Sequence, residues 1–315
     1  MSRIVYVHLA NPGVAGGQKV AVRHVETLCE LGFDAVVLAD RGVETPPWFE
    51  HRAPVVRGQP PGPDDIVVVP EDGWQALSVI AGSAAGRVVV ICQNPYYLAS
   101  SRTMEFIAER PERFSTLLTV GPRHAALMRR LFPQAAVEMV RCFADERRFR
   151  PLEKAPCIAY APRKRLLEAE AIRRLYHRLH GIPGLEWAAL DKITESQMAR
   201  ALGRASLFLS LSRLESVGMT TLEAMACGCV CAGFTGVGGA EFATPDNGFW
   251  APEDDCVAAA DALAAAVDPR RSGGPRLAQM LEAGRETAAA WSHAVFRREL
   301  EAVWTRLAPD ARRGG

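Results

Sequence analysis

Short runs of apolar, largely β-branched residues recur along the first half of the chain, separated by segments long enough to form helices. Such runs are typical of parallel strands that are buried on both faces. Residues 19–31 place Val22, Val25 and Leu28 on one helical face, and Gly32 then provides a helix stop. The predicted strands are residues 4–9, 35–39, 66–69, 88–92, 116–120 and 137–140. The pattern predicts a doubly wound α/β domain.

The second half repeats this alternation. Strands are predicted at residues 157–161, 185–189, 206–211 and 230–233, with helices centred near Leu175, Met198, Ala224 and Leu263. Residues 143–156 are rich in charge and proline and have no apolar period, which is the composition of a linker. We therefore predict a Rossmann-like domain at residues 1–150, a second at 151–290, and a closing helix at 291–308 that packs back on the first domain. Residues 312–315 have nothing to bury and are expected to be disordered.

Ligands of open parallel sheets bind at the carboxyl ends of the strands, where loops vary and helix N-termini point into the crevice. Two such domains facing each other form a cleft, so we expect the chemistry there. Residues 212–228 follow an apolar strand and carry Glu215 and Glu223, with seven residues between them. Gly218 leaves room for a ligand, and the amides of Met219 and Thr220 are expected to be free to bind a phosphate. Glu223, one turn further, is placed to accept the hydroxyls of a ribose.

The glutamate pair is followed by Ala-Met-Ala-Cys-Gly, an apolar strand, the glycine-rich residues 236–241 and the pair Asn247-Gly248. This combination resembles the retaining glycosyltransferases of family GT4, which have the GT-B fold. The resemblance implies that Glu223 binds the donor ribose, that Glu215 lies against the transferred sugar, and that Met219 and Thr220 bind the diphosphate. It also implies that Gly238 and Gly239 line the donor side. A donor role and a helix-capping role both stay open for Glu241.

Three consecutive cations, Arg163, Lys164 and Arg165, follow the first strand after the linker and are expected to face the cleft. Family members place an arginine here and a lysine some residues later, both on the leaving diphosphate. This chain departs from that pattern, since Pro162 replaces the glycine and Lys164 follows Arg163 directly. Arg163 is the better phosphate ligand because its planar fork binds two oxygens at once. Whether Lys164 or Arg165 turns inward stays open, as does a solvated basic turn.

The first domain offers less specific candidates. Residues 11–19 are glycine-rich but lack the spacing of a dinucleotide-binding loop or a P-loop, and a simple turn is the alternative. Gly16 and Gly17 resemble the loop with which this family's first domain approaches the donor phosphate and the acceptor. Residues 93–97, Gln-Asn-Pro-Tyr-Tyr, suit either a sugar acceptor or a structural loop. His124 is expected to open a helix, and His177 and His180 are expected at the surface without a carboxylate partner.

Composition narrows the choice of partners. The 315 residues suffice for two cores, and the net charge of +1 provides no general field for nucleic acid. No apolar run reaches membrane-spanning length, so a cytoplasmic protein is expected. Cys227, Cys229 and Cys231 are expected to pack in the core rather than bind metal. No Asp-x-Asp motif is present, and neither a metal nor a cofactor is expected beyond the nucleotide-sugar co-substrate.

Seven arginines form either a solvated face or a peripheral contact with anionic lipid or a phosphate-bearing acceptor. They are Arg123, Arg129, Arg130, Arg141, Arg147, Arg148 and Arg150.

The resemblance predicts a retaining, metal-independent glycosyltransferase that moves a sugar from a nucleoside-diphosphate sugar to a hydroxyl acceptor, in bacterial glycan or glycolipid assembly. Glu215, Arg163 and Lys164 form the expected catalytic set. Two alternatives stay open: a sugar-nucleotide epimerase or hydrolase of the same fold, and a binding protein that keeps the donor site without catalysis. Neither the donor base, the sugar nor the acceptor follows from the residues.

Overall fold

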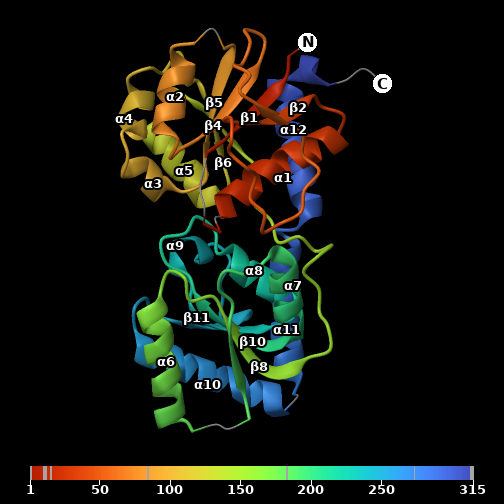
Figure 1. Cartoon of the computed structure of the whole chain (residues 1–315). Helices are drawn as coiled ribbons and strands as arrows, with labels where there is room; N and C mark the ends of the chain where they lie inside the picture. The colour runs from red at the N-terminus through yellow and green to blue at the C-terminus, as the bar shows by residue number, and fades with distance from the viewer. Residues whose placement is uncertain are drawn as a thin grey trace. The chain divides into compact units, whose positions relative to one another are not determined.

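The computed structural model describes residues 2–9, 13–14, 16–83, 85–181, 184–272 and 274–312, shown in Figure 1. The chain divides into two compact units. Unit 1 comprises residues 1–141 and 296–315, and unit 2 comprises residues 142–295. Each unit is built on one parallel sheet with helices on both faces, so the predicted fold class is confirmed.

The sheet of unit 1 has seven strands in the order β3-β2-β1-β4-β5-β6-β7. The strands are β1 (Ile4–His8), β2 (Ala35–Ala39), β3 (Val55–Arg57), β4 (Ile66–Pro70), β5 (Arg87–Cys92), β6 (Thr116–Thr119) and β7 (Ala136–Met139). Six match predicted apolar runs. The seventh, β3, was not predicted because it is a partly exposed three-residue edge strand, too short to show a pattern. The strand order reverses between β1 and β4, which is where open α/β sheets form their crevice.

The helices of unit 1 cover the two faces of this sheet. They are α1 (Gly16–Glu30), α2 (Trp74–Ala81), α3 (Pro95–Ala99), α4 (Thr103–Ala108), α5 (Pro122–Leu131) and most of α12 (His293–Leu307), followed by the short 3-10 helix Pro309–Ala311. Successive side chains of a strand point to opposite faces. Accordingly, Val7 of β1 packs in the apolar cluster under α2 to α5, whereas Tyr6 contacts His24 of α1 and Trp304 of α12.

The closing helix α12 completes the core of unit 1. From Phe296 onward it belongs to this unit, and Phe296, Leu300 and Trp304 are fully buried. The chain then returns to the sheet, where the amide of Asp34 donates to the carbonyl of Ala311 at 2.7 Å. Arg312 corrects the prediction of a disordered tail, since it pairs with Glu301 at 2.8 Å. Residues 313–315 lie outside the described part of the chain.

The sheet of unit 2 has five parallel strands in the order β12-β11-β10-β8-β9. They are β8 (Ala155–Tyr160), β9 (Glu186–Ala189), β10 (Ala205–Leu211), β11 (Val230–Phe234) and β12 (Gly248–Ala251). The helices are α6 (Leu166–Leu179), α7 (Glu195–Arg204), α8 (Met219–Ala226), α9 (Gly236–Gly239), α10 (Cys256–Ser272) and α11 (Pro275–Ala289). Figure 1 shows α6 and α10 on one face of the sheet and α7, α8 and α11 on the other. All four helices predicted for this half are present.

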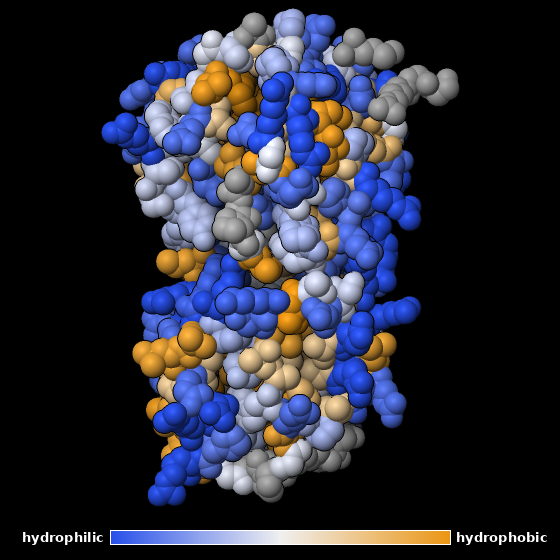
Figure 2. Space-filling view, viewed as in Figure 1, coloured by the Kyte–Doolittle hydropathy of each residue, from blue (hydrophilic) through white to orange (hydrophobic). Residues whose placement is uncertain are grey.

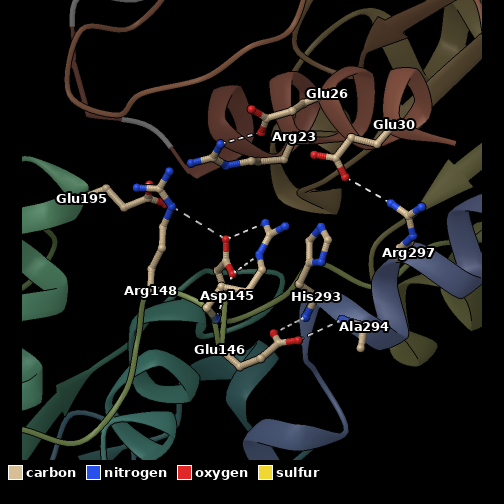
Figure 3. A network of polar contacts seen from close by, with 11 residues as sticks. Arg23, Glu26, Glu30, Asp145, Glu146, Arg148, Glu195, His293, Ala294 and Arg297 are labelled. Carbon is tan, nitrogen blue, oxygen red and sulfur yellow. Dashed lines mark hydrogen bonds and ion pairs between the residues drawn. The ribbon is translucent and has the colours of Figure 1, made fainter. Parts of the chain in front are cut away.

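Both segments that join the units are tied to each other within unit 2. The amide of Ala144 donates to the carbonyl of Trp291 at 2.9 Å, and the carboxylate of Glu146 accepts the amides of His293 at 2.7 Å and Ala294 at 3.2 Å. Figure 3 shows this carboxylate at the start of α12, where it satisfies amides that no helical carbonyl reaches. Because of these contacts, residues 142–150, which the sequence suggested for the first domain, lie in unit 2.

The cysteines of the second half are packing residues, as predicted. Cys227, Cys229 and Cys231 are buried, and the thiol of Cys229 donates to the carbonyls of Leu202 and Ala205, both at 3.3 Å. Burial raises the pKa of the Cys227 and Cys231 thiols. Across the described residues, no helix is both long and apolar enough to cross a membrane. On the face shown in Figure 2, hydrophilic residues are interspersed with small hydrophobic groups in both units.

Candidate functional site

The predicted residues of unit 2 gather at one edge of its sheet. Because the strands are parallel, all their carboxyl ends lie at the same edge. Four segments meet there: residues 161–165 after β8, residues 212–217 after β10, the helix α9 after β11, and residues 252–255 after β12. We call residues 212–217 the Glu215 loop and α9 the glycine turn.

Lys164 and Glu215 are in direct contact at this edge. The Lys164 ammonium lies 3.0 Å from the Glu215 carboxylate, and each side chain is 27% exposed. They come from the ends of adjacent strands, β8 and β10. Arg163 is exposed beside them. The structure thus brings the predicted catalytic lysine and glutamate together at the surface of unit 2.

Arg165 departs from the prediction that all three cations face a ligand. It is only 1% exposed, its Nε donates to the carbonyl of Ser212 at 3.0 Å, and its Nη2 lies 2.6 Å from Glu253. Its Nη1 binds Asp254. Arg163 and Lys164 are therefore the cations of this turn that remain accessible. The sequence could not separate them from Arg165, because the carboxylates that hold Arg165 lie 88 and 89 residues further along the chain.

The Glu215 loop leads into α8, which begins at Met219 with Gly218 as its N-cap. A Cβ at Gly218 would lie 3.0 Å from the hydroxyl of Ser212, so this position has little room for a side chain. The amide of Met219 had been expected to be free. In the structure it donates to the carbonyl of Val217 at 2.8 Å. Thr220 is partly exposed in the same first turn. The helix start therefore offers fewer phosphate-binding amides than the sequence suggested.

Glu223 lies on α8 and is 4% exposed, so it is not an ordinary surface glutamate. A buried carboxylate needs partners, because isolating its charge from water carries a large free-energy penalty. Its place on the helix that follows the Glu215 loop fits the predicted order of the two carboxylates. Glu241, in the turn after α9, is partly buried.

The glycine turn is a packing element as well as a candidate binding element. Gly238 and Gly239 are buried rather than open. A Cβ at Gly238 would lie 2.2 Å from the carbonyl oxygen of Ser216, so only glycine allows this approach to the Glu215 loop. The amide of Val237 also donates to the carbonyl of Arg213 at 3.0 Å. The turn thus supports the loop that carries Glu215.

In unit 1, Gly16 and Gly17 form the first turn of α1 instead of a loop. Asn11, Pro12 and Ala15 of the predicted glycine-rich loop lie outside the described residues. A Cβ at Gly17 would lie 3.2 Å from the Gln93 side-chain oxygen, so the first turn of α1 packs against the residue that follows β5. The side chain of Asn94 caps α3 by accepting the amide of Tyr96 at 3.0 Å, which gives residues 93–97 a structural role.

Sequence reasoning missed Glu71, which directly follows β4 at this edge of unit 1. It is 3% exposed, and one carboxylate oxygen accepts the amide of Asn94 at 2.6 Å. Burial, with a smaller contribution from Asp72, raises its pKa to about 8. Two adjacent acidic residues are typical of a solvated turn, so Glu71 and Asp72 gave no signal by composition. Their position directly after a buried strand was the signal that could have indicated a residue at the carboxyl edge of the sheet.

Of the three histidines singled out in the sequence, His177 is exposed, as predicted, whereas His124 and His180 contact other parts of the protein. His124 is buried in α5, where burial lowers its pKa to about 4. His180 does have a carboxylate partner, contrary to the prediction, since its Nε2 lies 2.8 Å from Asp261 of α10. Among the residues that the structure describes, no group of three or more His, Cys, Asp or Glu could hold a metal ion.

The seven arginines divide between the units. In unit 2, Arg147 is paired with Asp145, and Arg148 is paired with Glu195, the latter as Figure 3 shows. Arg141 is paired with Glu299 in unit 1. Arg123, Arg129 and Arg130 remain exposed on α5. Arg150 is exposed in unit 2. The predicted seven-residue basic face is therefore divided between the units, and three of its exposed arginines lie together on α5.

Comparison with known proteins relates the site to a family. Residues 165–268 match the model of the family described as glycosyl transferases group 1. The chain is also 26% identical, over 281 residues, to an alpha-1,6-glucosyltransferase of Actinobacillus pleuropneumoniae serotype 7 (strain AP76). That match covers 84% of this chain and 83% of the relative.

Solved structures share the fold across nearly the whole chain. Sucrose-phosphate synthase from Thermosynechococcus elongatus aligns with a TM-score of 0.71 and 15% identity, covering 98% of this chain and 99% of that one. Anabaena HepE in complex with UDP-glucose aligns with a TM-score of 0.67 and 11% identity, covering 96% of this chain and 99% of that one. The two units therefore have the GT-B fold, and the segment that matches the glycosyl transferases group 1 model, residues 165–268, includes the Glu215 loop, Glu223 and the glycine turn.

Proposed function

We propose that this protein is a retaining glycosyltransferase of the GT4 kind, which transfers a sugar from a nucleoside-diphosphate sugar to a hydroxyl acceptor without a metal ion. The donor binds to unit 2, where Arg163 and Lys164 receive the diphosphate, Glu215 contacts the sugar and Glu223 binds the ribose. The acceptor binds to unit 1, near Gly16, Gly17 and Gln93. The biological role of the protein in this proposal is glycan or glycolipid assembly in the cytoplasm of a bacterium.

The contact between Lys164 and Glu215 carries this proposal. A phosphate-binding cation and a sugar-binding carboxylate are needed side by side, because a glycosyl diphosphate presents its anionic and its sugar part to adjacent positions. The two side chains meet at 3.0 Å, at the strand ends that precede α6 and α8. A surface ion pair of purely structural value would not require a buried Glu223 on the helix that follows.

The relatives suggest which donor to test first. HepE has been crystallised with UDP and with UDP-glucose, and the curated relative is named for an alpha-1,6 linkage. The glucose of UDP-glucose is attached in the α configuration, so an α-linked product retains that configuration. These names favour UDP-glucose as donor and retention as outcome.

Cleavage of the glycosyl-diphosphate bond develops positive charge on the sugar ring and negative charge on the leaving phosphate. Fixed cations stabilise the leaving group without reorganisation, which is the role of Arg163 and Lys164. We assign no carboxylate nucleophile of the kind that retaining glycosidases use. Instead, the acceptor hydroxyl attacks the face from which the phosphate leaves, and the leaving phosphate takes its proton. An NMR spectrum of the product showing an inverted linkage would contradict this step.

A donor screen tests the proposal directly. Thermal unfolding is followed with UDP-, GDP- and ADP-sugars, starting with UDP-glucose. A ligand at 100 times its dissociation constant stabilises the folded protein by about 2.7 kcal/mol, which is readily measured. If no nucleotide sugar raises the melting temperature, the proposed function is wrong.

Replacing Glu223 by Ala is expected to weaken nucleoside-diphosphate binding at least about tenfold, since the loss of a charged hydrogen-bonding partner costs about 1.5–3 kcal/mol. Isothermal titration calorimetry measures the affinity. Glu195→Ala is the matched control, because Glu195 is equally buried in unit 2 but pairs with Arg148. Equal affinities in the two variants would remove the ribose role of Glu223.

Two further assays separate this function from its alternatives. Transfer that survives EDTA supports a metal-independent reaction, and loss of transfer restored by a divalent cation contradicts it. Donor incubated without acceptor distinguishes a transferase from an epimerase or hydrolase, since stoichiometric conversion to an epimer or a free sugar favours the alternative. Donor binding without any turnover on any acceptor favours a binding protein.

The exposed arginines of α5 extend the proposal to a peripheral membrane contact. Arg123, Arg129 and Arg130 lie on one helix with the partly exposed Leu131, and basic residues near an anionic surface each contribute about 1 kcal/mol. Vesicles of anionic lipid are expected to bind the protein better than neutral vesicles. Equal binding to both would exclude this contact.

A further inference from the structure

Arg165 is buried at the edge of unit 2 and has no role in the proposed chemistry. Its side chain is 1% exposed, and all three guanidinium nitrogens contact protein groups. Nε donates to the carbonyl of Ser212 at 3.0 Å, Nη2 lies 2.6 Å from Glu253, and Nη1 binds Asp254. The Cζ of Arg165 lies over the ring of Phe234, 4.6 Å from the ring centroid. A cation so enclosed cannot receive a phosphate.

Apart from Glu168 of α6, whose carboxylate lies 3.5 Å from Nη1, the partners of Arg165 belong to different strand ends. Arg165 follows β8, Ser212 follows β10, Phe234 ends β11, and Glu253 and Asp254 follow β12. The second oxygen of Glu253 accepts the amide of Gly236 at 2.7 Å, which extends the network to the first residue of the glycine turn. One side chain therefore connects four of the five strand ends of the sheet.

These connections determine where the candidate site residues lie. Ser212 is the first residue of the Glu215 loop, and Lys164 is the chain neighbour of Arg165. The glycine turn, which Glu253 holds at Gly236, packs against the same loop through Gly238 and Ser216. A shift of either contact moves Glu215 relative to Lys164.

The backbone at Asp254 is a second, independent observation. Its φ of 64° is in the left-handed region, which few residues other than glycine adopt, with aspartate among the more frequent of them. Such conformations persist where the surroundings impose them and are concentrated at functional sites. The contact that holds Asp254 is the one to Arg165, and this hydrogen bond also lowers the pKa of the Asp254 carboxyl.

We propose that Arg165 is the positioning residue of this site: it joins Ser212, Glu253 and Asp254 and so fixes the Glu215 loop and the glycine turn in the arrangement that receives a nucleoside diphosphate. The ligand in this statement rests on the proposed function. The fixing of the two segments does not, since it follows from the contacts alone.

Arginine is required for this role because of its shape. The planar guanidinium donates in three directions at once, whereas a lysine ammonium on a flexible stem cannot span the same acceptors. Arg165→Lys therefore keeps the charge but loses the connection between loops. Arg165→Met keeps much of the apolar stem and loses both. Glu253→Gln keeps an acceptor for Gly236 and weakens the contact with Arg165.

The control is Arg23→Lys in unit 1. Arg23 is 3% exposed, lies 2.6 Å from Glu26, as Figure 3 shows, and has its guanidinium 5.3 Å from the Phe49 ring centroid. It is thus a buried arginine with a carboxylate and an aromatic partner, as Arg165 is. Both variants remove a buried guanidinium from a carboxylate and an aromatic ring, so effects seen in Arg165→Lys alone report its additional contacts with the two site segments and not burial.

Two measurements are made on the full chain. Hydrogen-deuterium exchange compares peptides that contain residues 212–218 and 236–239 with a peptide from α11, and calorimetry measures the affinity for UDP, GDP and ADP. In Arg165→Lys and Arg165→Met we expect faster exchange in the two site segments, unchanged exchange in α11, and nucleoside-diphosphate affinity reduced about tenfold or more, a change of about 1.4 kcal/mol. Arg23→Lys is expected to leave all of these unchanged.

Each result decides the matter. Exchange that rises uniformly through unit 2, or site segments that exchange as in the unaltered protein, overturns the positioning role. If Arg165→Met does not fold, Arg165→Lys and Glu253→Gln supply the same comparison. If the unaltered protein binds none of the three nucleotides, the proposed function fails, and the exchange data alone then confirm or reject the role of Arg165.

Discussion

At the scale of single residues, the main feature of the site is the pairing of its cations with carboxylates. Lys164 and Glu215 are paired at 3.0 Å, whereas Arg165 is committed to Ser212, Glu253 and Asp254. A diphosphate that binds Lys164 must compete with Glu215 for the ammonium. In the proposed function, the same carboxylate would oppose binding of the leaving group and support binding of the sugar.

Glu215→Gln is accordingly expected to bind free nucleoside diphosphate a few-fold more tightly while losing sugar transfer. A partly exposed ion pair is worth up to about 1 kcal/mol, which sets the size of the gain. Calorimetry with UDP and a transfer assay measure the two effects. Glu170→Gln on α6, which removes a partly exposed ion pair with Arg173, is the control. Weaker UDP binding in Glu215→Gln would show that Glu215 does not restrain Lys164.

The raised pKa of Glu71 is expected to make the stability of the folded protein depend on pH. Its pKa is about 8 in the folded protein and 4.5 in its reference state. Between these values the unfolded chain has lost the proton that the folded chain retains, so the free energy of unfolding falls as pH rises through this window. A shift of one pKa unit corresponds to about 1.4 kcal/mol, so the full effect is on the order of a few kcal/mol.

Glu71→Gln is expected to remove this loss. The amide oxygen can still accept the Asn94 amide, so the variant should match the unaltered protein near pH 5 and exceed it near pH 8.5. Denaturant unfolding at the two pH values measures the difference. Parallel stability curves for the two proteins would mean that Glu71 is ionised in the folded state.

At the scale of elements, the sequence predicted most strands of both sheets, including the partly exposed β7 and β9. The central strand β10, in which every residue is buried, was recognised as an apolar run because five of its seven residues are apolar. The edge strand β3 has no such run, and the start of α1 was placed too late because two glycines are poor helix formers. The Glu215 loop and Glu223 were recognised by their spacing. The orientation of Arg165 and the closed amide of Met219 were not, because both depend on partners that only the folded chain brings near.

The glycine turn gives a prediction with an internal control. Gly238→Ala places a Cβ 2.2 Å from the Ser216 carbonyl oxygen, whereas at Gly239 the nearest atoms are 3.6 Å away. Overpacking of this kind costs about 1–3 kcal/mol. Gly238→Ala is therefore expected to lower the melting temperature and weaken nucleotide binding, and Gly239→Ala to be close to neutral. Similar behaviour of the two variants would contradict a packed contact at Gly238.

At the scale of the whole molecule, unit 1 depends on a helix that the chain adds last. Trp304 of α12 is fully buried against Tyr6 of β1, with 6.2 Å between ring centroids. Trp304→Ala is expected to destabilise unit 1 by about 3–5 kcal/mol. Hydrogen exchange should then quicken in β1 but not in β10 of unit 2. Equal acceleration in both strands would mean that the two units unfold as one.

The division of the chain sets how the molecule can be re-engineered. Residues 142–295 are one uninterrupted stretch, whereas unit 1 uses both termini and closes through Asp34 and Ala311. Unit 2 is thus a domain inserted into the sequence of unit 1, which is the host domain. Grafting a different module in its place takes two junctions, near residues 141 and 296, and leaves the host with its last helix. A single cut at either junction instead separates the host from part of its own core.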